Sequence, residues 1–157
     1  MRIINVLLFV ILATAATAAD TIIYNESADA KSDIKQALTQ ATAAKVPVII
    51  VFGGNWCGDC KSLDWSMRKG ASAPLFERDF KIVKVDVGHF DKNLDVAKSY
   101  GVPIEKGIPA VVIISTNNVV LYATKEGELA NARKMGDDGI YQFFKRVTAS
   151  ASAAAKK

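Results

Sequence analysis

The feature that most constrains the fold is a pair of cysteines, Cys57 and Cys60, which are the only two in the chain. They follow the run 46–52, which is apolar and rich in β-branched residues and therefore indicates a strand buried on both faces. Two glycines allow the chain to turn after this strand. A helix is expected to begin at the cysteines and to run to about Lys69. A C-x-x-C motif between a strand and a helix is typical of a redox-active site.

The position of the two cysteines also predicts their roles. Unpaired backbone N–H groups and the positive end of the helix dipole stabilise a thiolate at a helix N-terminus. We therefore expect Cys57, on the exposed first turn, to be the nucleophile and Cys60, about one turn later, to resolve the mixed disulfide. A purely structural disulfide would close too small a loop to stabilise the fold much. A metal site usually needs four ligands, and His89 is the only further soft donor.

Three motifs resemble the thioredoxin family in the family's own order. The stretch Trp56-Cys57-Gly58-Asp59-Cys60-Lys61 resembles its active site, 83–87 followed by 94–102 resembles its third strand and next helix, and Gly107-Ile108-Pro109-Ala110 resembles its cis-proline loop. The resemblance covers about residues 30–148. It implies an α/β, thioredoxin-like fold with a central mixed β-sheet flanked by helices.

The segment after Cys60 departs from ordinary thioredoxins. Trp65 stands where the family often has a kinking proline, and this segment is more similar to the C-terminal domain of the periplasmic thiol-reducing transporter. We expect Trp65 to be a core aromatic residue.

The remaining elements are predicted from periodicity and turn residues. A first helix is expected to end near Ala44, with Asn25, Ser27 or Asp29 as its N-cap. The further predictions are a strand at 80–87, a helix at 91–100, a hairpin of 109–115 and 119–124, a short helix at 128–134 and a final amphipathic helix through 140–147.

The resemblance also implies a substrate-binding set, namely Trp56, Gly58, Asp59, Ile108 and Pro109. A cis bond at Pro109 would turn the Ile108 backbone towards the cysteines, where it could pair with an extended substrate. Trp56 would form an apolar wall of that groove. The anionic Asp59 would disfavour a Cys57 thiolate and so favour a reductant over an oxidant.

Two charged residues are candidates for handling the proton of Cys60. The family often has a buried aspartate six residues before the first cysteine, but Val51 stands there. Asp64 follows Cys60 at i, i+4 and is a physical substitute, with a solvated surface charge as the alternative interpretation. Lys84 matches a lysine that often accompanies the missing aspartate. We count both with the cysteines as catalytic candidates.

The chain is predicted to contain one domain and two flanking segments. Residues 1–19 resemble a signal peptide, with one charge, an apolar run and an A-x-A site at 16–18. A thioredoxin-like domain at 20–149 and a flexible tail at 150–157 are expected to follow. The net charge of +4 is spread along the chain, which gives nucleic-acid binding no support. We expect a periplasmic monomer, or alternatively a secreted one, with no stable membrane insertion after cleavage.

The function predicted from the sequence is that of an exported thiol–disulfide oxidoreductase, a reductase or isomerase of protein disulfides. No cofactor is expected. A separate thiol electron donor is implied, a membrane reductase being one candidate, because the chain has no second cysteine pair. Two alternatives stay open from the sequence: a thioredoxin-fold binding or assembly module without redox turnover, and a metallochaperone using Cys57, Cys60 and His89.

Overall fold

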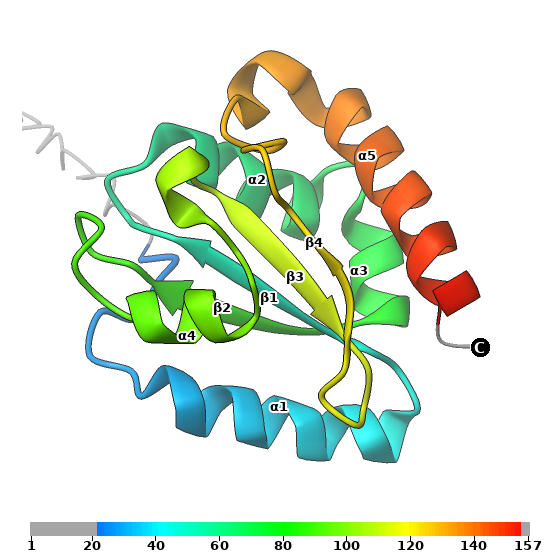
Figure 1. Cartoon of the computed structure of the whole chain (residues 1–157). Coiled ribbons are helices and arrows are strands. Elements are labelled where there is room, and N and C mark those ends of the chain that lie inside the picture. The colour runs from blue at the N-terminus through cyan, green and yellow to red at the C-terminus, as the bar shows by residue number, and fades with distance from the viewer. Residues whose placement is uncertain (1–21, 155–157) are drawn as a thin grey trace, which may run out of the picture.

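A four-stranded sheet in the order β2-β1-β3-β4 forms the centre of the computed structural model, which describes residues 22–154 (Figure 1). β1 (Val48–Gly53) pairs in parallel with β2 (Lys81–Asp86) and antiparallel with β3 (Ala110–Ile114). β3 pairs antiparallel with β4 (Val120–Ala123). Every residue of β1 and β3 is buried, as the unalternating apolar sequence predicts. The expected mixed sheet is confirmed.

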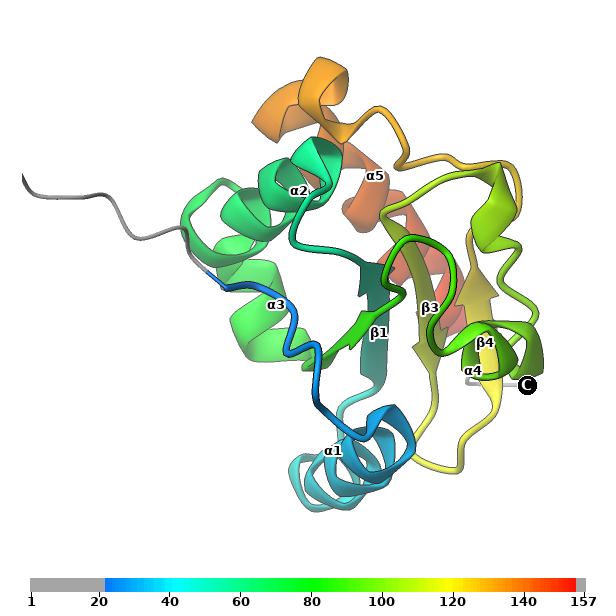
Figure 2. The same cartoon turned by 90° about the vertical axis from the view of Figure 1, so that its left-hand side faces the viewer.

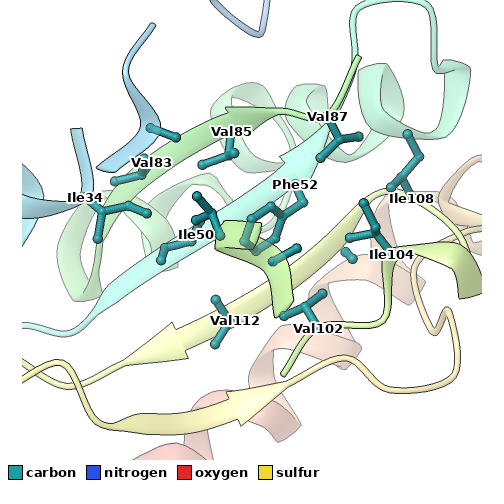
Figure 3. Close-up of a cluster of buried hydrophobic side chains, with 14 of the residues drawn as sticks. Ile34, Ile50, Phe52, Val83, Val85, Val87, Val102, Ile104, Ile108 and Val112 are labelled. Carbon is teal, nitrogen blue, oxygen red and sulfur yellow. The ribbon is translucent and has the colours of Figure 1, made fainter. Parts of the chain in front are cut away.

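Helices cover both faces of the sheet, as the two views show (Figures 1 and 2). One face carries α1 (Ala30–Ala44), α4 (Leu94–Ser99) and the short 3₁₀ helix η1 (Ile104–Lys106), and the other carries α2 (Gly58–Lys69), α3 (Ala73–Asp79) and α5 (Ala132–Ala154). On the first face, side chains of the sheet meet Ile34 of α1 and Val102 and Ile104 in one apolar cluster (Figure 3). Burial of these two apolar layers is the main stabilising contribution to the fold.

The N-terminal ends of α1 and α2 are fixed by side chains. Asp29 caps α1, because its carboxylate accepts hydrogen bonds from the backbone N–H groups of Lys31 and Ser32. This confirms one of the three predicted caps. Cys57 caps α2, which places the cysteine pair at the carboxyl end of β1, where the chain leaves the sheet.

Several predictions about individual elements were wrong. Trp65 is 51% exposed and is no core residue, because it lies on the side of α2 opposite the buried Leu63 and Met67. Helix α3 was not predicted. The short helix expected at 128–134 is displaced: 128–131 form turns, and the helical turn that begins at Ala132 is joined to the final helix. Instead α5 begins at Ala132 and is kinked at Gly136, whose φ of 66° favours glycine.

The flanking segments fall largely outside the described residues. The predicted signal peptide at 1–19 lies outside them, as do residues 155–157 of the predicted tail. Within them, α5 continues to Ala154, past the tail boundary expected at 149, because the alanine-rich end of the chain favours helix. Between residues 22 and 154 no helix is both long and apolar enough to cross a membrane.

Candidate active site

The cysteine pair forms a disulfide across the first turn of α2. The Cα atoms of Cys57 and Cys60 are 5.2 Å apart, and Cys57 Sγ accepts a hydrogen bond from the backbone N–H of Cys60 at 3.1 Å. Cys57 keeps 5% of its surface exposed and Cys60 keeps none. Cys57 is thus more covered than expected, but it is still the more accessible of the two sulfurs. A nucleophile at the helix N-cap and a resolver beneath it agree with this geometry.

The loop before β3 faces the cysteines. The Ile108–Pro109 peptide bond is cis, and Cys57 Sγ lies 3.7 Å from the carbonyl oxygen of Ile108. The backbone of Ile108 therefore borders the sulfur expected to attack a substrate. The structure brings this predicted pair of binding residues to the cysteines although they are about 50 residues away in the sequence.

Trp56 forms an aromatic wall beside the cysteines and is 49% exposed. Its Nε1–H donates a hydrogen bond to the carbonyl of Gly88 at 2.7 Å, and its ring stacks on His89 with the centroids 5.0 Å apart. Phe90 packs edge-on at 6.0 Å. His89, considered above as a metal ligand, thus supports the tryptophan ring. Among residues 22–154, no three His, Cys, Asp or Glu side chains form a group that could hold a metal ion.

Asp64 is a buried charge with two cationic partners, so its interpretation as a solvated surface charge was wrong. Its side chain is 3% exposed; Oδ1 lies 2.9 Å from Lys84 Nζ, and Oδ2 accepts hydrogen bonds from the guanidinium of Arg68. Lys84 itself is only 19% exposed. Arg68 was not predicted, although its i, i+4 spacing from Asp64 on α2 could have revealed it. Val51, at the family's usual acid position, is fully buried and apolar.

The partners decide the charge state of this cluster. Burial works to raise the pKa of Asp64, but the hydrogen bond from Arg68 and the charge of Lys84 outweigh it, so the pKa lies below its ordinary value. Burial lowers the pKa of Lys84, and the attraction to Asp64 offsets this only in part. Asp64 is therefore ionised at neutral pH and is a weaker base than an unpaired buried carboxylate would be.

Asp59 is paired with Arg133, which the sequence gave no reason to single out. Its carboxylate accepts a hydrogen bond from the backbone N–H of Arg133 at 2.9 Å and lies 3.0 Å from Arg133 Nη2. Burial works to raise the pKa of Asp59, but these hydrogen bonds outweigh it and hold the pKa low. The guanidinium also lies against Gly58, where an added Cβ would be 3.1 Å from Nη1. The negative charge of Asp59 near Cys57 is thus paired with the positive charge of Arg133.

Comparison with known proteins places this site in a family. A model of the thioredoxin-like family matches residues 29–115. The chain belongs to the thioredoxin-like family. A curated thioredoxin from Pseudomonas aeruginosa is 31% identical over 94 residues, which are 55% of this chain and 71% of that protein.

Two solved structures are similar to this chain to different degrees. A disulphide isomerase from Xylella fastidiosa Temecula1 is 48% identical, with a TM-score of 0.79 over 83% of this chain and 99% of the other. The oxidised C-terminal domain of DsbD from Neisseria meningitidis is 18% identical, with a TM-score of 0.47 over 76% of this chain and 96% of the other. With a redox-type cysteine pair at the end of a buried strand, this thioredoxin-like chain is a thiol–disulfide oxidoreductase.

Proposed function

We propose that the chain reduces or isomerises disulfide bonds of protein substrates outside the cytoplasm. The observation that carries this proposal is the position of Cys57 Sγ at the N-cap of α2, 3.7 Å from the Ile108 carbonyl oxygen. A sulfur next to main-chain groups suits an extended polypeptide, which can pair with a backbone regardless of its sequence. The 48% identical neighbour, described as a disulphide isomerase, supports the same substrate class.

The reaction proceeds in two exchange steps. The Cys57 thiolate attacks one sulfur of a substrate disulfide, which forms a mixed disulfide and releases the other substrate sulfur as a thiolate. Cys60 then gives up its proton, and its sulfur attacks Cys57 Sγ. The second substrate sulfur leaves as a thiolate and takes up a proton. The substrate gains two electrons, and the protein is left with the Cys57–Cys60 disulfide seen in the structure. In isomerisation, a substrate thiolate attacks the mixed disulfide instead and restores the dithiol.

Asp64 receives the proton of Cys60 in this scheme. It lies one turn further along the same buried face of α2, and Lys84 and Arg68 hold its carboxylate in place. Its low pKa makes the protonated carboxyl short-lived, so the proton passes on to the departing substrate thiolate. Lys84 positions the carboxylate and compensates its charge.

The substrate groove is lined by the predicted binding set. Trp56 gives it an apolar side and the Ile108–Pro109 loop gives it main-chain groups, while Gly58 lies beside the nucleophile with the Arg133 guanidinium against it. Asp59 contributes at its edge together with Arg133.

The reducing equivalents come from a separate thiol donor, because the two cysteines are the only ones in the chain. A membrane reductase that acts in the periplasm is the proposed donor. Residues 1–19 direct export and are removed, and the remaining chain works as a monomeric domain. N-terminal sequencing of the exported protein should begin at Ala19 or Asp20; recovery of intact Met1 in a membrane fraction would contradict this.

Insulin reduction by dithiothreitol and the refolding of scrambled ribonuclease test the proposed activity. The wild-type protein should accelerate both assays, whereas Cys57→Ser should accelerate neither. Cys60→Ser should keep some isomerase activity, because isomerisation needs only the attacking thiolate. A wild-type protein that cycles with dithiothreitol but accelerates neither assay would refute the proposal.

A further inference from the structure

Tyr24 is a fully buried tyrosine whose hydroxyl group has no partner. Its side chain has no exposed surface, and Oη makes no hydrogen bond with any residue in the described part of the chain. Buried hydroxyl groups nearly always have a hydrogen-bond partner, so one without a partner requires an explanation.

The unpaired hydroxyl faces the resolving cysteine. A Cβ atom added to Gly53 would overlap Tyr24 Oη and would also lie 2.9 Å from Cys60 Sγ. The oxygen and the sulfur therefore border the same small space beside the Gly53 Cα atom. Gly53 is the last residue of β1, and this close approach is the reason that a glycine suits the position.

The side chain of Asn55 holds Tyr24 in this position. Asn55 Oδ1 accepts hydrogen bonds from the backbone N–H groups of Ile23 and Tyr24, and Asn55 Nδ2 donates to the Tyr24 carbonyl, each at 2.9 Å. Asn55 belongs to the active-site loop, two residues before Cys57. The segment that precedes α1 is thereby attached to the loop that carries the nucleophile.

The surroundings of Tyr24 keep its hydroxyl protonated. Burial raises the pKa of Tyr24 far above its ordinary value, and the negative charges of Asp64 and Asp86 raise it further. Lys84 Nζ lies 5.8 Å from the centre of the ring, on the same side of the fold as Asp64. The group is thus available as a hydrogen-bond donor and not as a base.

We propose that the Tyr24 hydroxyl donates a hydrogen bond to Cys60 Sγ whenever that sulfur is outside the disulfide. A thiolate is a strong acceptor, whereas a sulfur in a disulfide is a poor one, so the hydroxyl gains its partner on reduction. Tyr24 keeps its own proton; the proton of Cys60 passes to Asp64 and then to the leaving thiolate, as in the two exchange steps above. The inference deepens the proposed function, because it assigns a donor to the resolving thiolate.

Tyr24→Phe tests this role, because it removes the oxygen and keeps the ring. Tyr100→Phe is the matched control: its hydroxyl donates to Asn118 Oδ1 at 3.0 Å, on an exposed part of the fold. Loss of a bond made only in the reduced protein should change the dithiol–disulfide equilibrium constant by about 2- to 12-fold. The midpoint potential of Tyr24→Phe should fall accordingly, by about 30 mV for a tenfold change. Resolution of a mixed disulfide with a model peptide should slow by a smaller factor, because without the donor the Cys60 thiolate is less populated but more nucleophilic. Tyr100→Phe should match the wild type.

Wild-type protein provides a second measurement that needs no variant to fold. The ¹³C resonance of the Tyr24 ring carbon bonded to the hydroxyl should shift on reduction, and that of Tyr100 should not. An unchanged Tyr24 resonance would overturn the proposal, as would a Tyr24→Phe protein with wild-type potential and resolution rate. Failure of the protein-substrate assays alone would refute the proposed function and leave this inference standing, because the potential and the resonance are measured without a protein substrate.

Discussion

Breaking the Asp64–Lys84 ion pair should reveal a large coupling energy beneath the active site. Unit charges 2.9 Å apart attract each other by about 6 kcal/mol at an effective dielectric constant of 20. The cost of removing both groups from water cancels much of this attraction. Asp64→Asn removes the anion beside Lys84, whose side chain is only 19% exposed. It should therefore lower the free energy of unfolding by about 3 kcal/mol, the lower end of the range for buried pairs.

The double variant separates coupling from the loss of each side chain. Lys84→Met should cost less than Asp64→Asn, because Arg68 still pairs with the carboxylate. The double variant should lose less free energy of unfolding than the two single variants lose in sum, by about 1–3 kcal/mol. Urea unfolding of the oxidised protein at neutral pH measures all four proteins.

An exposed pair provides the control for this cycle. Lys31 Nζ lies 2.6 Å from Asp95 Oδ2, but both side chains are more than half exposed, and the coupling between them should be close to zero. If the losses of unfolding free energy in Asp64→Asn and Lys84→Met simply add, the coupling energy is as small as that of the exposed pair. That result would refute the argument that this cluster is desolvated.

Three further predictions concern the proton and the charges around the cysteines. Asp64→Asn should slow resolution of a trapped mixed disulfide. The slowing should be smaller than the 10²–10⁴-fold typical of a full general base, because the pKa of Asp64 is low, and it should fade by pH 9. Equal resolution rates at every pH would exclude Asp64 as the proton acceptor. Since the pKa of Asp64 is lower in the folded than in the unfolded protein, its stabilising contribution is complete above pH of about 4 and is lost as the pH falls through the folded value. Urea midpoints should therefore decline less steeply with acid in Asp64→Asn than in the wild type, and parallel declines would count against this. Arg133→Ala should slow alkylation of reduced Cys57 at low salt and not at high salt, because Asp59 then lacks its cation; identical iodoacetamide rates at both ionic strengths would contradict this.

Local sequence patterns were enough to predict the framework of the fold. The four strands follow from apolar runs between turn residues, and the cap of α1, Asp29, was one of three candidates that the sequence offered. Asp64 could be proposed because i, i+4 residues share a helix face. Trp65 was misplaced because the resemblance gave no information on which side of α2 it would lie, and it turned out to be exposed.

Contacts between distant parts of the chain could not be predicted. Arg133 reaches Asp59 across 74 positions, and Asn55 holds Tyr24 across 31. No local sequence pattern indicates either contact. The first forms only when α5 is packed in place, and the second only when the segment before α1 is packed in place. The orphan hydroxyl of Tyr24 likewise becomes visible only once its burial is known.

The division of labour between the two cysteines is the central claim, and trapping of the mixed disulfide tests it most directly. Reduced Cys60→Ser and Cys57→Ser proteins are each mixed with a peptide that contains one disulfide, and the products are mapped by mass spectrometry. Cys60→Ser should accumulate a peptide attached to Cys57, because attack proceeds and resolution does not. Cys57→Ser should accumulate little, because Cys60 has no exposed surface. Rapid accumulation on Cys60 in Cys57→Ser, with little on Cys57 in Cys60→Ser, would contradict the account.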